Sequence, residues 1–225
     1  MLDVLYEDNH LLVVNKPAGL LVQGDETGDK TLPDLAKDYL REKYNKPGNI
    51  FVGVVHRLDR PVSGVVVLAK TSKALSRMNE LFRSNKTRKT YLAVSLQKPT
   101  QTEARLVHFL VKDATKNIIK AFTSEKPGSQ RAELSYKLLM HREQFFLIQV
   151  NPVTGRPHQI RVQLASQKSP IMGDVKYGAP AFLPDKRIGL HAYQLEFEHP
   201  VQKTPIKITA PLPDVQPWKI FRKDF

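Results

Sequence analysis

A charged turn enclosed by two apolar segments constrains the fold of this chain most strongly. Residues 50–55 and 65–69 have the composition of β-strands, and the segment between them places Asp59 between Arg57 and Arg60. The two positive charges favour the ionised form of the carboxylate, which makes Asp59 a candidate nucleophile. A turn aspartate that only binds local backbone N–H groups is the alternative from these residues alone.

Charge and composition narrow the class of protein. Lys and Arg number 35 against 22 Asp and Glu, so that the net charge is +13. Such an excess suits a nucleic acid partner, although it also serves solubility. The chain has no cysteine, which excludes disulfides, cysteine-ligated zinc and a thiolate nucleophile. No apolar run reaches the roughly 20 residues of a membrane span, and no signal peptide is evident, so we expect a cytoplasmic protein without membrane contact.

Apolar periodicity predicts three helices among many strands. Helices are expected over residues 31–44, from Thr71 or Ser72 to about Phe82, and over 157–166. Strands are expected over residues 11–14, 91–96, 105–111, 117–122, 132–139, 145–150, 188–197 and 206–209, with long loops around the short strands of 97–130. This mixture favours an α+β fold with a large, mainly antiparallel sheet, and we expect residues 1–225 to form one domain.

Two further segments contain candidate functional residues. Tyr91 begins an apolar strand, where a tyrosine is usually part of the core. Residues 154–161 read as a turn entering a helix with Pro157 near its start, which fits either an anion site or an ordinary capped helix with solvated arginines. A basic cluster follows the second helix and fits either a solvated turn or a phosphate-facing surface: Arg83, Lys86, Arg88 and Lys89.

Several of these segments together resemble the RluA family of pseudouridine synthases. Residues 56–64 are similar to its signature His-Arg-Leu-Asp, two variable residues, Thr-Ser-Gly, with Val62 in place of Thr. Residues 89–93 resemble its Lys-x-Tyr-x-Ala motif, and residues 154–161 match Thr-Gly-Arg-x-His-Gln-Ile-Arg at every fixed position. Residues 170–178 are similar to Pro-Ile-x-Gly-Asp-x-x-Tyr-Gly. Together the motifs span most of the chain.

The resemblance implies a fold, a reaction and roles for individual residues. It implies the pseudouridine synthase fold with a central RNA-binding cleft, and the isomerisation of uridine to pseudouridine in ribosomal or transfer RNA. Asp59 would be the nucleophile, Tyr91 would stack on the base and Arg161 would pair with Asp59. Further substrate contacts are expected from His56, Arg57, Arg60, Arg156, His158, Gln159 and Leu190.

The same resemblance sets expectations for cofactors, partners and other readings. An isomerisation calls for no metal and no cofactor, and the partner would be an RNA stem-loop bound by a monomer without a separate N-terminal RNA-binding domain. Asp174 would be structural. Gln163 and Lys168 replace a common histidine and a common glycine of the family, which affects the substrate subtype more than the reaction. A non-catalytic RNA-binding or assembly factor that keeps the fold is the alternative.

Overall fold

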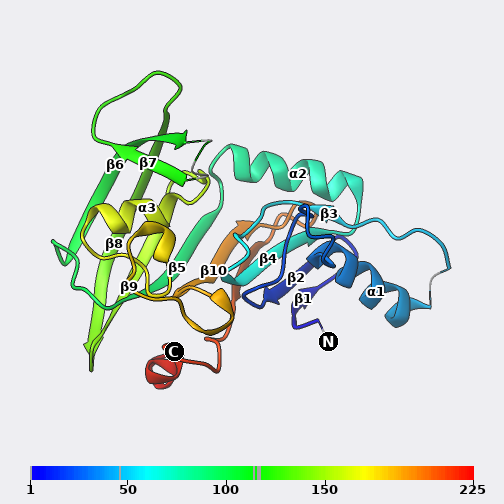
Figure 1. Cartoon of the computed structure of the whole chain (residues 1–225). Coiled ribbons are helices and arrows are strands. Elements are labelled where there is room, and N and C mark those ends of the chain that lie inside the picture. Colours follow the sequence, from blue (N-terminus) through cyan, green and yellow to red (C-terminus); the bar gives the residue numbers. More distant parts are fainter. Residues whose placement is uncertain (1, 46, 114, 116–117) are drawn as a thin grey trace. The chain divides into compact units, whose positions relative to one another are not determined.

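The computed structural model describes residues 2–45, 47–113, 115 and 118–225 (Figure 1). Contacts divide the chain into two compact units, which are residues 1–88 with 192–211 and residues 89–191 with 212–225. The helices are α1 (Leu32–Tyr44), α2 (Ser72–Arg83) and α3 (Gln159–Ser166). The strands are β1 (Val4–Glu7), β2 (Leu11–Lys16), β3 (Gly53–Val54), β4 (Ser63–Ala69), β5 (Arg88–Ser95), β6 (Glu103–Asp113), β7 (Ile118–Phe122), β8 (Gln130–Arg142), β9 (Phe145–Pro152), β10 (Leu190–Glu198) and β11 (Pro205–Thr209).

The first unit is built on an antiparallel sheet in which β4 is central. Strand β2 pairs with β1 and β4, β3 also pairs with β4, and β10 pairs with β11. The register of β2 and β4 runs from Leu11 opposite Ala69 to Lys16 opposite Gly64. Every residue of β4 is buried, as expected for a run of valines at the centre of a sheet. The turn with Asp59 therefore enters one of the most firmly packed strands of the unit.

The two helices of the first unit begin where their capping residues predict. Thr31 caps α1 in a capping box with Asp34, and a proline occupies the first turn. The hydroxyl of Thr71 accepts a hydrogen bond from the backbone N–H of Ala74 at the start of α2, at 3.1 Å. The apolar stripe of α2 packs into the core of the unit, whose buried members include Val65, Val67, Met78, Leu195, Phe197 and Ile208.

The second unit contains an antiparallel sheet in the order β5-β9-β8-β6-β7. Helix α3 packs against β6 and β7, and Val162 joins a small core with Leu110, Ile119 and Ala132. This helix begins at Gln159, two residues later than predicted, because His158 has a left-handed backbone with φ 52°. Pro157 therefore lies before the helix, and the predicted helical start at Pro157 was wrong.

Most predicted elements are present, and the differences have local reasons. The strand expected over residues 50–55 is reduced to Gly53–Val54. The strands expected over residues 105–111 and 117–122 are present as β6 and β7, and β6 extends two residues further at each end because it pairs with both β7 and β8. The predicted start of the next strand at Asn117 lies outside the described residues. Strand β1 was not predicted.

Two expectations concern the chain as a whole. Among the described helices, none has the length and apolar character of a membrane span. That residues 1–225 fold as one domain stays a prediction.

Candidate active site

Asp59 lies in the loop that connects β3 to β4 in the first unit. The loop closes in a turn, in which the backbone N–H of Val62 donates to the carbonyl of Asp59 at 3.0 Å. Leu58 and Val62 are buried on either side of the turn, whereas Asp59 is half-buried. The two apolar neighbours fix the loop to the core and leave the carboxylate in a partly hydrated position, which suits a nucleophile better than full burial does.

A buried lysine binds the backbone of this loop. Lys16, the last residue of β2, has no exposed surface, and its ammonium group donates to the carbonyls of Pro17 at 3.0 Å, Leu20 at 2.8 Å and Arg60 at 3.3 Å. Burial lowers the pKa of Lys16 to about 7, and the nearby charge of Asp59 opposes this shift. Lys16 therefore links the segment that follows β2 to the Asp59 loop and places its ammonium group near Asp59.

Sequence reasoning missed this role of Lys16. The predicted strand ended at residue 14, and both the burial of Lys16 and its position opposite Gly64 emerge only from the structure.

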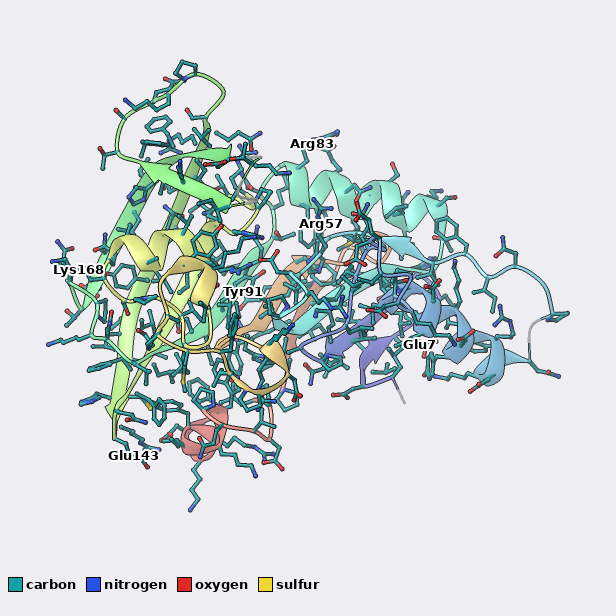
Figure 2. All side chains as sticks on the ribbon, viewed as in Figure 1. Glu7, Arg57, Arg83, Tyr91, Glu143 and Lys168 are labelled. Carbon is teal, nitrogen blue, oxygen red and sulfur yellow. The ribbon has the colours of Figure 1, made fainter. Side chains whose placement is uncertain are left out.

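The two arginines that flank Asp59 are held in different ways. Arg60 donates from Nε to the carbonyl of Gly19 at 3.1 Å and from Nη2 to Asp29 at 2.6 Å. Arg57 is exposed and donates from Nη1 to the side-chain oxygen of Gln23 at 2.6 Å (Figure 2). Arg60 therefore ties two loops together, whereas Arg57 is the less restrained cation.

His56 anchors the start of the same loop. Its Nε2 accepts a hydrogen bond from the backbone N–H of Val67 at 3.1 Å, and its ring stacks on Phe82 of α2 with a centroid distance of 4.7 Å. An accepting Nε2 requires the neutral ring with its proton on Nδ1. These contacts make His56 a residue that positions the loop against β4 and α2, and its predicted contact with substrate stays a prediction.

In the second unit, Arg161 of α3 forms a buried two-pronged ion pair with Asp174. Its Nε lies 2.7 Å and its Nη2 2.8 Å from the two carboxylate oxygens, and both side chains are almost fully buried. The guanidinium also lies over the ring of Tyr177, 5.1 Å from the centroid. The pair fixes the plane of Arg161 and agrees with the structural role expected for Asp174. Asp59 belongs to the other unit, so that its pairing with Arg161 stays a prediction.

A second contact orients the segment before α3. The hydroxyl oxygen of Tyr177 accepts from the backbone N–H of Ile119 at 2.9 Å and lies 2.7 Å from Nδ1 of His158. Because this oxygen accepts from the N–H of Ile119 through one lone pair, the hydroxyl can still donate its own proton to Nδ1 of a neutral His158. Sequence reasoning did not single out Tyr177, although it is the tyrosine of the motif at residues 170–178.

The remaining predicted residues also belong to the second unit. Gln159 is buried. Its side-chain oxygen accepts from the hydroxyl of Thr154 at 2.7 Å and from the backbone N–H of Arg156 at 3.0 Å, and these two bonds fix the turn before α3. Arg156 is exposed. Tyr91 is half-buried on β5 opposite Val150 of β9 (Figure 2), and Leu190 is the buried first residue of β10. Their predicted contacts with substrate stay predictions.

The described residues contain no group of three or more His, Asp or Glu side chains arranged to hold a metal ion.

Comparison with known proteins places these features in a family. The family model of RNA pseudouridylate synthase matches residues 10–166. The ribosomal large subunit pseudouridine synthase D of Xylella fastidiosa is 36% identical over 95% of this chain, and synthase C of Vibrio parahaemolyticus is 34% identical over 93%. The chain spans only 66% and 65% of the length of these two relatives. A tRNA pseudouridine synthase C of Vibrio cholerae is 31% identical over 100% of this chain and 96% of its own length.

A solved structure supports the same assignment. Human RNA pseudouridylate synthase domain containing 4 superposes with a TM-score of 0.78 at 25% identity, covering 94% of this chain and 89% of its own. The predicted α+β fold and the resemblance to the RluA family are thereby confirmed, and the chain belongs to the RNA pseudouridylate synthase family.

Proposed function

We propose that this chain isomerises uridine to pseudouridine within structured ribosomal or transfer RNA, with Asp59 as the nucleophile. The observation that carries this proposal is the anchored loop around Asp59, in which Lys16, His56 and Arg60 hold the backbone while the carboxylate stays half-buried. A binding protein needs no carboxylate held in this way, whereas a covalent reaction at a buried base requires one.

The reaction exchanges one bond of the nucleoside for another. The bond between ribose C1′ and N1 of uracil breaks, the detached uracil turns, and C5 then bonds to C1′. C5 loses its proton and N1 gains one, so that no atom is added or removed. Asp59 forms a transient bond either with C1′ or with C6 of uracil, and both routes satisfy this balance.

The other residues would prepare and complete these steps. A stacked uridine has to leave the helix before Asp59 can reach it, which costs a few kcal/mol. Arg57 is suited to fill the vacated space because its planar guanidinium stacks on bases and has one exposed hydrogen bond to give up. Tyr91 would stack on the flipped uracil and accept the proton from C5.

Arg161 would orient the carboxylate of Asp59. Asp174 binds Nε and Nη2 of its guanidinium, and we propose that the same guanidinium also pairs with Asp59. A guanidinium fixed on one side by a buried carboxylate offers its other side in a single orientation, which limits the positions open to Asp59. Asp174 would then be a positioning residue for the reaction.

A tritium-release assay tests the proposal. Total ribosomal and transfer RNA from cells fed with uridine tritiated at C5 is incubated with the protein, and the tritium released to water is counted. We expect release by the wild type, loss of release in Asp59→Ala and an affinity for RNA within a few-fold of the wild type. The control Asp38→Ala removes an exposed carboxylate on α1 and should keep full release. Background release by the wild type and Asp59→Ala alike, with RNA binding intact, would favour the non-catalytic alternative.

A further inference from the structure

The first unit contains a groove, apart from the Asp59 loop, to which no function has been assigned. It has a volume of about 800 Å³ and lies between the turn that follows α2 and the hairpin of β10 and β11. The turn contributes Lys86, Thr87 and Arg88, and the charged residues of the hairpin side are Lys203, Lys207, Glu196 and Glu198. We call this feature the basic groove. Arg83, labelled in Figure 2, ends α2 next to it.

The turn side of the basic groove is rigid. The N–H of Lys86 donates to the carbonyl of Leu81 at 2.9 Å, and the N–H of Asn85 donates to the carbonyl of Phe82 at 3.3 Å. Asn85 has a left-handed backbone with φ 54°, which completes a Schellman motif at the end of α2. The backbone that carries Lys86 and Arg88 is therefore fixed before any ligand arrives, which lowers the entropic cost of binding.

The charges of the basic groove leave an excess of cations. Lys203 lies 3.2 Å from Glu198, and Lys207 lies 3.7 Å from Glu196, so that the hairpin lysines have acidic partners. Lys86 and Arg88 are exposed and form no ion pair with any residue that the structure describes. Two cations on a fixed turn, beside two weakly paired lysines, would attract an anion.

The lining of the groove indicates the chemistry of the ligand. Besides its cations, the groove includes apolar surface from Phe197, Pro205 and Ile206. Phosphate oxygens accept hydrogen bonds from Lys and Arg, while sugars and bases cover apolar surface. An RNA strand combines these properties, whereas an acidic peptide lacks the flat bases.

We propose that the basic groove binds the phosphates of an RNA strand that flanks the target uridine. This inference rests on the proposed function for the identity of the ligand. The groove and Asp59 belong to the same unit, so that a strand held in the groove would add affinity without taking part in the reaction.

Salt-dependent binding of a single-stranded RNA tests the inference. The probe is a fluorescein-labelled 15-nucleotide polyuridine, and its Kd is measured by anisotropy between 50 and 300 mM KCl. For Lys86→Ala combined with Arg88→Ala, we expect Kd at 100 mM KCl to rise about tenfold. The slope of log Kd against log salt should fall by about 1.4, since each lost contact to a single strand removes about 0.7.

A matched double variant separates a site from an effect of net charge. Lys37→Ala combined with Lys73→Ala removes the same charge from α1 and from the opposite end of α2. We expect its slope to change by less than about 0.3. Equal slopes for the two double variants would overturn the inference. So would a larger loss of binding to polyglutamate than to RNA in the groove variant, because the groove would then fit an acidic peptide.

The outcome for the basic groove is separable from that for the proposed function. If the wild type releases tritium but the groove variant binds RNA as the wild type does, only the groove inference fails. If no RNA yields tritium while the groove variant loses affinity, only the proposed function fails. Circular dichroism of both double variants establishes that they are folded.

Discussion

Replacing Lys16 with methionine removes the buried ammonium group beneath the Asp59 loop and nearly preserves the side-chain volume. The wild-type ammonium donates to three carbonyls, and its pKa is lowered to about 7 by burial. Two effects therefore oppose each other in Lys16→Met. The variant no longer buries a charge, but the carbonyls of Pro17, Leu20 and Arg60 lose their donor.

The structure supplies the magnitude of each effect. A pKa lowered from 10.5 to about 7 corresponds to about 5 kcal/mol of free energy by which burial penalises the charged form. Three carbonyls without donors cost about 1 to 3 kcal/mol each. Below pH 7 the two effects nearly cancel, and we expect the free energy of unfolding of Lys16→Met to lie within about 4 kcal/mol of the wild type.

The dependence on pH is the sharper prediction. Between about pH 7 and 10.5, the unfolded wild type binds a proton at Lys16 that the folded protein lacks, so that its free energy of unfolding increases with pH. The destabilisation caused by burying the charged ammonium group is complete below pH 7 and decreases as the pH rises. From pH 7 to pH 9, we expect the wild type to gain about 2 kcal/mol relative to Lys16→Met, since all other titrating groups are common to both.

Urea unfolding followed by circular dichroism at pH 6, 7, 8 and 9 measures this difference. Lys30→Met, which removes an exposed lysine on the surface, should follow the wild type at every pH. A constant difference between wild type and Lys16→Met from pH 7 to 9 would refute the reasoning, because the buried lysine would then keep an ordinary pKa. Since the variant also loosens the Asp59 loop, we expect tritium release to fall by about 10 to 100-fold.

Two other substitutions test the structure around the site. Asp174→Asn removes the charge of the buried carboxylate that binds Nε and Nη2 of Arg161, so that we expect a loss of about 3 to 5 kcal/mol in urea unfolding and a lower kcat of tritium release. Gly64→Ala should destabilise by about 3 to 5 kcal/mol, because φ is +116° and an added Cβ would lie 2.3 Å from the carbonyl oxygen of Ala192.

Matched controls accompany both substitutions. Asp185→Asn removes the carboxylate of an exposed pair and should change stability by less than about 1 kcal/mol. Gly24→Ala places a Cβ at an ordinary 3.8 Å from Thr31 without a left-handed backbone, and a similarly small change is expected. A small effect of Asp174→Asn, comparable to that of Asp185→Asn, would contradict the importance of the buried pair.

The sequence was most informative where local chemistry decides structure. The start of α2 was predicted at Thr71 or Ser72 because a hydroxyl before an apolar helical pattern satisfies free N–H groups, and Thr71 forms such a bond. The start of α3 was misplaced because the left-handed backbone of His158 depends on tertiary contacts, including its contact with Tyr177. The length of β6 depends on its pairing with β7 and β8. A short stretch of sequence contains no information about such pairing.

In the candidate site, too, some residues could be predicted from the sequence and others could not. Asp59, Tyr91 and Arg161 were predicted as catalytic residues through motifs, and these roles stay predictions. The supporting residues were less visible, since support depends on which groups meet in space. Lys16 was given no role in the predicted site, and the pairing of Asp174 with Arg161 joins residues 13 positions apart. The sequence therefore indicated the chemistry better than the supports that orient it.

The two arginines beside Asp59 show how contacts that the sequence does not reveal affect the mechanism. In the sequence, Arg57 and Arg60 flank Asp59 as equivalent charges, but the structure makes them unequal. Arg60 would have to give up both Gly19 and Asp29 in order to move, whereas Arg57 would give up one exposed hydrogen bond, worth about 0.5 to 1.5 kcal/mol. A side chain that replaces a flipped base must leave its resting position at small cost. The contacts of the loop therefore favour Arg57 for that step and leave Arg60 to hold the loop that contains Asp59, the proposed nucleophile.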